Sequence, residues 1–381
     1  MQFESYPFEK LNILLNDISP NDNFVPLSLT IGEPQFDTPL FIQEALNSSV
    51  HLLNKYPKTA GEDYLKDAMI SYMKSRFDIS LKPKEIVPSF GTREVLFNFP
   101  QFLLDDIANP VMAFPNPFYQ IYEGAAIASR AEVRYLTLEE KNNFLPEIDE
   151  SSLEDIDLII LNSPNNPTGS VMSYESLKEW VKLALKYDFV LLNDECYIDL
   201  YTNEPLPSIL NASIAVGNSE FKNILTINSI SKRSSAPGLR SGFIAGDAKI
   251  LKKYLEYRTY VGCASPLPLQ VAAAAAWSDQ SHVIAFRDQY KANLKLAREI
   301  LDVEVPEATF YVWLKVDDEL EFTKKLYSDF NVKVLPGSFL GREGAGKGYV
   351  RLALVYDEAK TKEALGRIKT LLQEIQQGEK R

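Results

Sequence analysis

Cysteine and histidine are scarce in this chain of 381 residues, which contains two of each. Two histidines and two cysteines are too few for a typical zinc site or for a disulfide framework. A chain without disulfides is suited to the reducing cytoplasm, where we expect this protein to reside. The first residues have neither a basic nor an apolar leader segment, and no apolar run reaches the roughly 18 residues of a membrane helix. We therefore expect neither export nor membrane insertion.

Basic residues are also in deficit, with 40 lysines and arginines against 52 acidic residues and a net charge of −12. Because nucleic-acid backbones attract surplus positive charge, we expect no nucleic-acid partner. The hydrophobic share of 45% and the charged share of 24% are ordinary for a soluble globular protein. The length favours two domains, or one large α/β core with an appendage.

Short apolar runs alternate with helical patterns through the middle of the chain. Strands are expected at residues 110–114, 157–161, 189–192, 224–227 and 242–245. Continuous apolar runs of this length are typical of a parallel sheet that is covered on both faces. Between two of them, apolar residues from Leu177 to Leu185 recur at helical spacing, with Ser173 as a candidate N-cap. Strand–helix–strand repetition predicts βαβ units with right-handed crossovers.

The last third of the chain has a different pattern. Alternation over residues 310–316 predicts a half-buried strand, residues 350–355 predict another, and residues 364–375 predict a terminal helix with a frayed end from Gln376 onward. We therefore expect a large cofactor-binding domain at 41–265. A smaller α+β domain would comprise residues 1–40 and 266–381.

Polar motifs follow the predicted strands, where ligands of open α/β sheets bind. The Gly91-Thr92 turn opens a helix, which suits a phosphate, although an ordinary helix cap is the alternative. A loop with the sequence Asn-Ser-Pro-Asn-Asn-Pro-Thr-Gly presents Asn166, and its alternative is a plain turn. Asp194 follows a third strand, and its carboxylate would keep an aromatic nitrogen base protonated unless it is merely a solvated loop acid.

The fourth motif contains Lys232, which follows a strand and has Arg233 and Arg240 nearby. Positive charge around a lysine lowers its pKa from about 10.4 towards neutrality, which makes the amine a nucleophile for a carbonyl. Ser229 and Arg240 are suited to share a phosphate. The alternative is a basic surface turn. Together the four motifs indicate a cofactor with a phosphate, an aldehyde and a ring nitrogen, which is pyridoxal 5'-phosphate.

These motifs resemble those of the class I/II pyridoxal-phosphate aminotransferases with the aspartate aminotransferase fold. The resemblance implies an α/β fold in which a large domain surrounds a mainly parallel sheet and a smaller domain is α+β. It also implies how the cofactor is held: Lys232 binds its aldehyde, Asp194 its ring nitrogen, Tyr197 and Asn166 its ring hydroxyl, Tyr119 stacks on the ring, and Gly91, Thr92, Ser229 and Arg240 hold its phosphate.

The same resemblance implies a substrate site and a partner subunit. Arg351 matches the arginine that binds the substrate α-carboxylate, and Gly32 lines that pocket together with Asn166. Tyr56 matches a tyrosine that reaches the phosphate of the neighbouring subunit, which implies a homodimer. Amino acids and keto acids would be the small-molecule substrates.

Longer segments, among them 91–97, 116–124 and 237–243, resemble succinyldiaminopimelate aminotransferases. That resemblance implies a glutamate-dependent step in lysine and diaminopimelate biosynthesis. The chain departs from that pattern at Val261 and at 235–236. An acetylornithine-type or general amino-acid aminotransferase and a β-lyase therefore stay as alternatives, and a non-catalytic regulator is disfavoured because residues 1–40 are too short for a DNA-binding domain. Arg93, Arg233 and Arg258 are candidates for binding the distal groups of the substrate, and for each of them a structural ion pair is the alternative.

Four further features point to no function. Residues 341–348 nearly match a phosphate-binding P-loop, but Gly348 stands where Ser or Thr would hold a metal ion, so a flexible surface loop is expected. His51 and His282 are expected at the surface or as caps, and Cys196 as a small buried filler.

Overall fold

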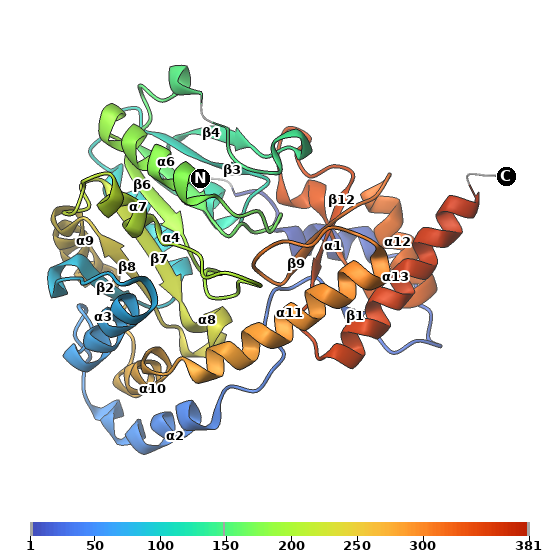
Figure 1. Cartoon of the computed structure of the whole chain (residues 1–381), viewed down its shortest axis with the longest axis horizontal. Coiled ribbons are helices and arrows are strands. Elements are labelled where there is room, and N and C mark those ends of the chain that lie inside the picture. The colour runs from blue at the N-terminus through green and yellow to red at the C-terminus, as the bar shows by residue number, and fades with distance from the viewer. Residues whose placement is uncertain (1–2, 148, 379–381) are drawn as a thin grey trace.

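Seven strands form the central sheet of the larger domain in the computed structural model, which describes residues 3–147 and 149–378 (Figure 1). Their order across the sheet is β2-β8-β7-β6-β5-β3-β4, and β8 alone runs antiparallel to its neighbours. The strands are β2 (Ile86–Ser89), β3 (Val111–Asn116), β4 (Glu132–Thr137), β5 (Leu158–Asn162), β6 (Val190–Asp194), β7 (Ile224–Ser229) and β8 (Gly242–Gly246). All five predicted strands are confirmed, and the sheet is mainly parallel, as expected.

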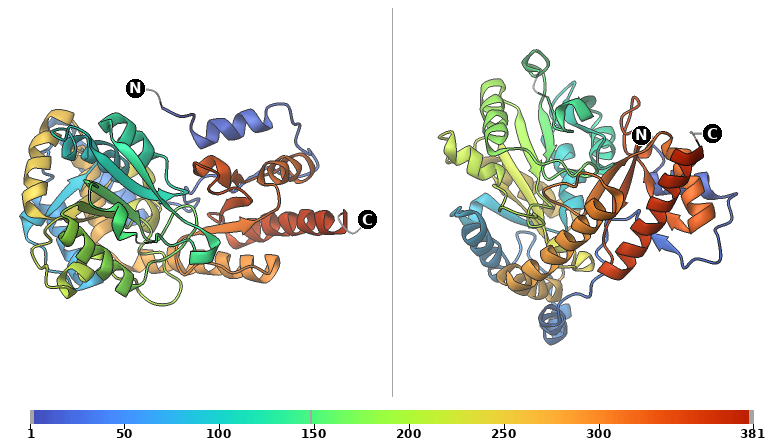
Figure 2. Two further views of the ribbon diagram at one scale, coloured as in Figure 1. Left: turned by 90° about the horizontal axis from the view of Figure 1, so that it is seen from above. Right: turned by 45° about the vertical axis from the view of Figure 1, so that its right-hand side comes forward.

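Helices cover both faces of this sheet (Figure 2). Side chains alternate between the faces along each strand: Ile159 packs on one side with α3, α6, α7 and α10, whereas Ile160 packs on the other side with α4, α5 and α9. The predicted cap of α6 is confirmed, because the Ser173 hydroxyl accepts a hydrogen bond from the Ser176 amide at 3.1 Å. The helices are α2 (Leu40–Ser49), α3 (Asp63–Phe77), α4 (Thr92–Leu103), α5 (Ile121–Ser129), α6 (Tyr174–Tyr187), α7 (Ile209–Ala215), α8 (Ile230–Arg233), α9 (Ala248–Val261) and α10 (Leu267–Ser278).

The smaller domain is built on an antiparallel sheet of three strands and a parallel pair of short strands. The sheet contains β11 (Leu335–Pro336), β12 (Tyr349–Ala353) and β9 (Tyr311–Lys315), and the pair contains β1 (Leu27–Ser28) and β10 (Val332–Lys333). The helices of this part are α1 (Pro7–Leu15), α11 (Ser281–Leu301), α12 (Glu319–Phe330) and α13 (Glu358–Gly378). The predicted terminal helix is confirmed, but it continues to Gly378 and is not frayed at Gln376. Short 3-10 helices lie at Val50–Asn54, Pro83–Glu85, Glu140–Asn142, Glu150–Ser152, Pro237–Leu239 and Gly337–Leu340.

The packing of α10 bears on the domain boundary. The expected boundary near residue 266 places this helix in the smaller domain, yet Ala273 and Trp277 lie in the apolar core of the larger domain, where α10 contacts α2 and α3. We therefore propose that the larger domain extends through α10. The long helix α11 then runs from the larger domain to the smaller one (Figure 1).

The glycine-rich loop at 341–348 lies at the surface, as expected, and Glu343, Gly344 and Lys347 are exposed, but contacts of Arg342 anchor the start of the loop. Arg342 forms an ion pair of 2.5 Å with Glu123 of the larger domain. Its backbone also exchanges two hydrogen bonds of 3.0 Å with the Asn116 side chain. These contacts of the loop join the smaller domain to the larger one. A strand, β12, follows the loop, whereas a helix follows a phosphate-binding P-loop. None of the helices in the described part of the chain is sufficiently long and apolar to span a membrane.

Candidate active site

A pocket of about 580 Å³ lies at the carboxyl ends of β5, β6 and β7 and is lined by residues of both domains. Ten of the predicted site residues line it: Gly32, Thr92, Tyr119, Asn166, Asp194, Tyr197, Ser229, Lys232, Arg240 and Arg351. Gly91 and Tyr56 do not line it. The strand ends bring these residues together because neighbouring parallel strands end at the same edge of the sheet. Each of the strands β5, β6 and β7 ends in a polar residue, and this residue is still paired with the neighbouring strand: Asn162 of β5 pairs with Asp194 of β6, and Ser229 of β7 pairs with Gly242 of β8.

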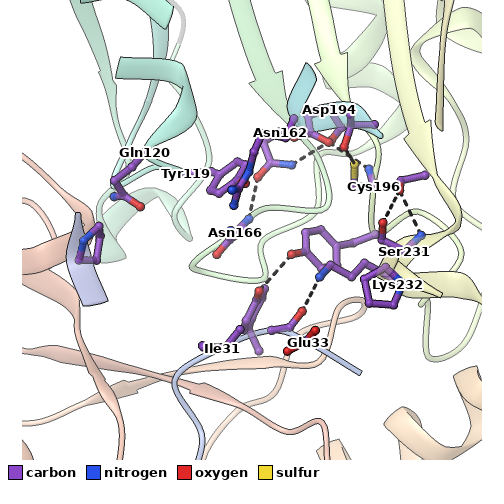
Figure 3. A pocket seen from close by; sticks show the side chains of 18 of the residues that line it. Ile31, Glu33, Tyr119, Gln120, Asn162, Asn166, Asp194, Cys196, Ser231 and Lys232 are labelled. Carbon is purple, nitrogen blue, oxygen red and sulfur yellow. Dashed lines mark hydrogen bonds between the residues drawn. The ribbon is translucent and has the colours of Figure 1, made fainter. Parts of the chain in front are cut away.

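Lys232 projects into this pocket from α8, directly after β7 (Figure 3). Its ammonium donates a hydrogen bond to the carbonyl oxygen of Gly32. Loss of solvation is the main cause that lowers the pKa of Lys232 to about 8, and the positive charges of Arg351 and Arg240 act in the same direction. Nearby positive charge was the expected cause of a lowered pKa, but burial of Lys232 lowers the pKa more than these charges do. A lysine with this pKa is available near neutral pH both as a nucleophile and as a base.

Asp194 ends β6 and is nearly fully buried. Its carboxylate accepts hydrogen bonds from the Tyr122 hydroxyl at 2.8 Å and from the Cys196 amide at 3.1 Å. Asn162 donates to the backbone carbonyl of Asp194 at 2.9 Å and accepts from the Asn166 amide, so it links two loops of the pocket (Figure 3). Burial raises the pKa of Asp194, and the hydrogen bonds from Cys196 and Tyr122 oppose that shift.

The start of α4 forms a cradle for an anion. The first amides of a helix have no partner within the helix, and they carry partial positive charge. Gly91 caps α4 at a φ of +76°, and a Cβ there would lie 2.3 Å from Nη2 of Arg240. Gly91 thus allows the guanidinium to approach the helix start. Ser229 lines the pocket alongside, so these groups suit a phosphate.

Arg351 projects into the pocket from β12 of the smaller domain. Its guanidinium donates to the Asn166 side chain at 2.7 Å and to the Thr30 carbonyl at 2.5 Å. Its Nε is buried and has no hydrogen-bond partner among the residues that the structure describes. The guanidinium also lies 4.5 Å from the centre of the Tyr311 ring. An arginine that is buried here with spare donor capacity is suited to bind a carboxylate.

Comparison with known proteins matches residues 25–368 to the family model for aminotransferases of class I and II. The chain belongs to this family. An aminotransferase named AspB from Helicobacter pylori has a crystal structure that superposes with a TM-score of 0.95 at 51% identity, over 97% of this chain and 99% of that one. An aminotransferase structure from Neisseria meningitidis gives 0.92 at 41% identity, over 97% and 98%. An LL-diaminopimelate aminotransferase from Natranaerobius thermophilus is 31% identical over 90% of each chain.

The aminotransferase therefore depends on pyridoxal phosphate, as its family does. The pocket fits this cofactor in two respects. Asp194 is a buried carboxylate with no ion-pair partner in the described ranges, so a protonated ring nitrogen would compensate its charge. A side chain at Gly91 would fill the cradle beside Arg240, which glycine leaves open. For the same described residues, no group of three or more His, Cys, Asp or Glu side chains is arranged to hold a metal ion.

Tyr56 lies outside the pocket of its own chain. Its side chain is fully exposed, and with Leu53, Ala264 and Leu267 it lines a separate surface hollow. Its predicted role at the phosphate of a neighbouring subunit therefore stays a prediction.

Two of the three arginines that were candidates for the distal groups of the substrate instead form structural ion pairs, which was the alternative. Arg233 points away from the pocket and pairs with Asp199 at 2.7 Å, and Arg258 pairs with Glu94 at 2.9 Å. Both arginines are 1% exposed. Arg93 does line the pocket. Arg233 is adjacent to Lys232 in sequence, but neighbouring residues of a helix project in different directions.

Several pocket residues were not predicted. Asn162, Tyr122 and Ser231 lie inside or next to the motifs, so closer reading of those motifs would have found them. Cys196 was expected as a filler, but it lines the pocket, and its sulfur lies 3.2 Å from the Thr92 hydroxyl. The segment 6–8 also lines the pocket, and no pattern in the sequence pointed to it.

Proposed function

We propose that this aminotransferase converts a succinylated diaminopimelate and its keto acid into one another, with glutamate as amino donor, in lysine and diaminopimelate biosynthesis. Several related sequences are named LL-diaminopimelate aminotransferases, which supports a long substrate with carboxylates at both ends. We also propose that the protein acts in the cytoplasm as a homodimer.

The observation that carries this proposal is a further guanidinium in the pocket wall, besides those of Arg351 and Arg240. Arg93, on the second residue of α4, donates through Nε to the Tyr119 hydroxyl at 2.9 Å. This bond holds the guanidinium at the pocket, and its two terminal nitrogens have no hydrogen-bond partner in the part of the chain that the structure describes. A fork of free donors is suited to a distal carboxylate. Arg351 and Arg93 come from different domains, so a substrate with two carboxylates would bridge them.

Each of the main residues of the pocket has a separate role in the proposed transamination. Arg351 binds the α-carboxylate and so directs the Cα–H bond towards Lys232. Pyridoxal phosphate, when bound, supplies an electron sink for the charge that develops at Cα. Asp194 keeps the ring nitrogen protonated, and Tyr122 holds that carboxylate in place. The Lys232 amine takes the proton from Cα of the amino donor in one half-reaction and gives a proton to Cα of the product in the other. An amine with a pKa near neutrality is suited to both roles.

Other substrates are possible on the same scaffold. Relatives of similar identity are named for aspartate in Pyrococcus abyssi and for a tetracycline precursor in Streptomyces rimosus. An acetylornithine-type or general amino-acid aminotransferase is therefore the second candidate. A β-lyase is disfavoured, because the family and the matched relatives are aminotransferases.

The experiment is a panel of keto-acid acceptors with glutamate as donor. We expect the highest kcat/KM with the succinylated keto acid, and we expect Arg93→Ala to raise its KM by about 10- to 100-fold, since a hydrogen bond to a charged group contributes about 1.5–3 kcal/mol. The KM for pyruvate, which has no distal carboxylate, should not change. Arg130→Ala, an exposed arginine outside the pocket, is the control.

Two results would contradict the proposal. Turnover of an acetylated acceptor without turnover of the succinylated one would favour the acetylornithine-type alternative. Release of ammonia and pyruvate from a substrate with a leaving group at Cβ, without dependence on a keto acid, would indicate a β-lyase.

A further inference from the structure

A buried ionic cluster lies behind the pocket, on the side of α8 that faces away from it. Arg233 donates through Nε to Asp199 at 2.7 Å, and Arg76 donates to the other carboxylate oxygen at 2.9 Å. The Tyr72 hydroxyl donates to Asp199 at 2.9 Å and accepts from the Asn228 side chain at 3.2 Å. Asp199 is 3% exposed and Arg233 is 1% exposed. Neither lines the pocket.

This cluster connects the two loops that carry the proposed chemistry. Asp199 lies in the segment that follows β6, the strand that ends at Asp194, whereas Arg233 is the residue directly after Lys232. The helix α8 has only four residues, which is about one turn. One turn of helix has almost no stability of its own, so the direction of Lys232 depends on contacts made by its neighbours.

The far end of the Arg233 guanidinium fixes α8 to the start of the interdomain helix. Its terminal nitrogens donate to the Gln280 side chain at 2.7 Å and to the carbonyl of Ala276 at 3.2 Å. The next residue, Ser234, is joined through its hydroxyl to Nε2 of His282 at 2.8 Å. Gln280 and His282 lie where α10 ends and α11 begins. The segment that carries Lys232 is therefore held from three sides by buried polar contacts.

We propose that Arg233 and Asp199 are positioning residues, which hold Lys232 in register with Asp194 so that its amine can transfer the substrate proton. This proposal rests on the proposed role of Lys232. Proton transfer requires the reacting atoms to stay within hydrogen-bond distance, and a displacement of about 1 Å lowers a rate by about 100-fold. Arg76 and Tyr72 would keep Asp199 partnered if Arg233 were removed, so the effect of Arg233 on Lys232 can be measured in a folded protein.

The test compares Arg233→Met and Arg233→Lys with the wild-type holoenzyme. We measure kcat, KM and the isotope effect on kcat with glutamate deuterated at Cα. For Arg233→Met we expect kcat to fall by about 10- to 100-fold with KM changed by less than about threefold. The isotope effect should increase, because proton transfer becomes slower relative to the other steps. Arg233→Lys, which can still pair with Asp199, should recover at least part of kcat.

Arg367→Met is the matched control. Arg367 is 7% exposed and donates to the backbone carbonyls of Val25 at 2.8 Å and Phe330 at 3.0 Å in the smaller domain, away from the pocket. We expect it to lower the melting temperature while kcat and the isotope effect stay unchanged. If Arg233→Met does not fold, Arg233→Lys decides, with an expected loss of about 3- to 10-fold in kcat and an increased isotope effect.

The proposal would be overturned if the Arg233 variants lost stability like Arg367→Met but kept kcat, or lost kcat without any increase in the isotope effect. A Lys232→Ala variant, measured in parallel, separates the two levels of the argument. Turnover by Lys232→Ala would overturn both the role of Lys232 and this inference. If Lys232→Ala lost turnover but the Arg233 variants kept the wild-type kcat and isotope effect, only this inference would be overturned.

Discussion

Lys232 is a case in which the environment of one residue determines its chemistry. An ordinary lysine is almost fully protonated at neutral pH, whereas burial lowers the pKa of this one to about 8. The protonated form cannot attack an aldehyde, because its nitrogen has no free electron pair. The neutral form increases as the pH rises through this value, so covalent capture of the cofactor should become faster in the same interval.

We predict that the apoenzyme binds pyridoxal phosphate covalently at a rate that rises with pH and has its inflection at about 8. The measurement follows the absorbance of the lysine-bound cofactor after rapid mixing at a series of pH values. Lys222→Ala, which removes a surface lysine paired with Asp188, serves as control and should give the same profile. An inflection near 10 would show that Lys232 is not desolvated as described here.

The types of the site residues could be predicted from the sequence, but the directions of side chains could not. Lys232, Asp194 and Asn166 follow predicted strands, so the edge of the sheet brings them together. The sequence left two roles open for Arg258, because its partner Glu94 is distant in sequence and only the fold shows that the two form a buried pair. His282, expected at the surface or as a cap, is half-buried, and its contact with Ser234 likewise follows only from the fold.

At the scale of elements, the loop after β6 carries two buried acids, Glu195 and Asp199. Glu195 accepts hydrogen bonds through one oxygen from the Ile209 amide at 2.7 Å, the Asn193 side chain at 3.0 Å and the Ser208 hydroxyl at 3.1 Å. Burial raises the pKa of Glu195 to about 7 despite these bonds. This side chain joins the loop to the start of α7, so its protonation affects an element next to the active site.

We predict that Glu195→Gln makes the free energy of unfolding of the aminotransferase less dependent on pH between about 4.5 and 7. In this interval the folded state binds more protons at Glu195 than the unfolded state, so the free energy of unfolding of the wild type falls as the pH rises. The raised pKa of Glu195 corresponds to a change of at most roughly 3 kcal/mol in the free energy of unfolding over this interval. Melting temperatures of both proteins at pH 5 and pH 8 measure the effect. Glu179→Gln on the exposed face of α6 is the control.

A wild-type melting temperature that rises between pH 5 and pH 8 as much as that of Glu195→Gln would contradict this prediction. It would mean that Glu195 is already ionised in the folded protein at pH 5.

The elements themselves were predictable where they are long and periodic. Five strands of the central sheet and the helices α6 and α13 follow from apolar runs and helical spacing, whereas the partly exposed edge strand β4 has no apolar run and was not predicted. The strands β1, β10 and β11 have two residues each, which is too short for any period, and they exist because distant segments pair. The alanine-rich α10 has apolar residues on all sides, so its sequence did not show which domain it joins.

At the scale of the whole molecule, one face exposes large apolar side chains around the hollow that contains Tyr56. Leu53 is 71% exposed and Tyr56 is fully exposed, and both side chains line this hollow. Contiguous apolar surface of this kind is typical of protein interfaces. We expect a second copy of the chain to cover this face, which would place Tyr56 at the other subunit.

We predict that the protein sediments at twice its chain mass of 43.1 kDa and that Leu53→Asp shifts it towards the monomer. A charge buried in an interface is costly unless it is paired. Sedimentation velocity at several concentrations measures the mass. Val25→Asp places the same charge at a residue of the smaller domain that is 70% exposed, and it should remain dimeric. A wild-type monomer at all concentrations, or a dimer unaffected by Leu53→Asp, would contradict the prediction.

The central claim is that Lys232 is the residue that binds the cofactor. It is tested most directly by reducing the holoenzyme with borohydride, which fixes the cofactor to its lysine as a secondary amine, and by locating the modified peptide with mass spectrometry. We predict one modified site, at Lys232. Modification of another lysine, or a holoenzyme that carries no modification after reduction, would contradict the account.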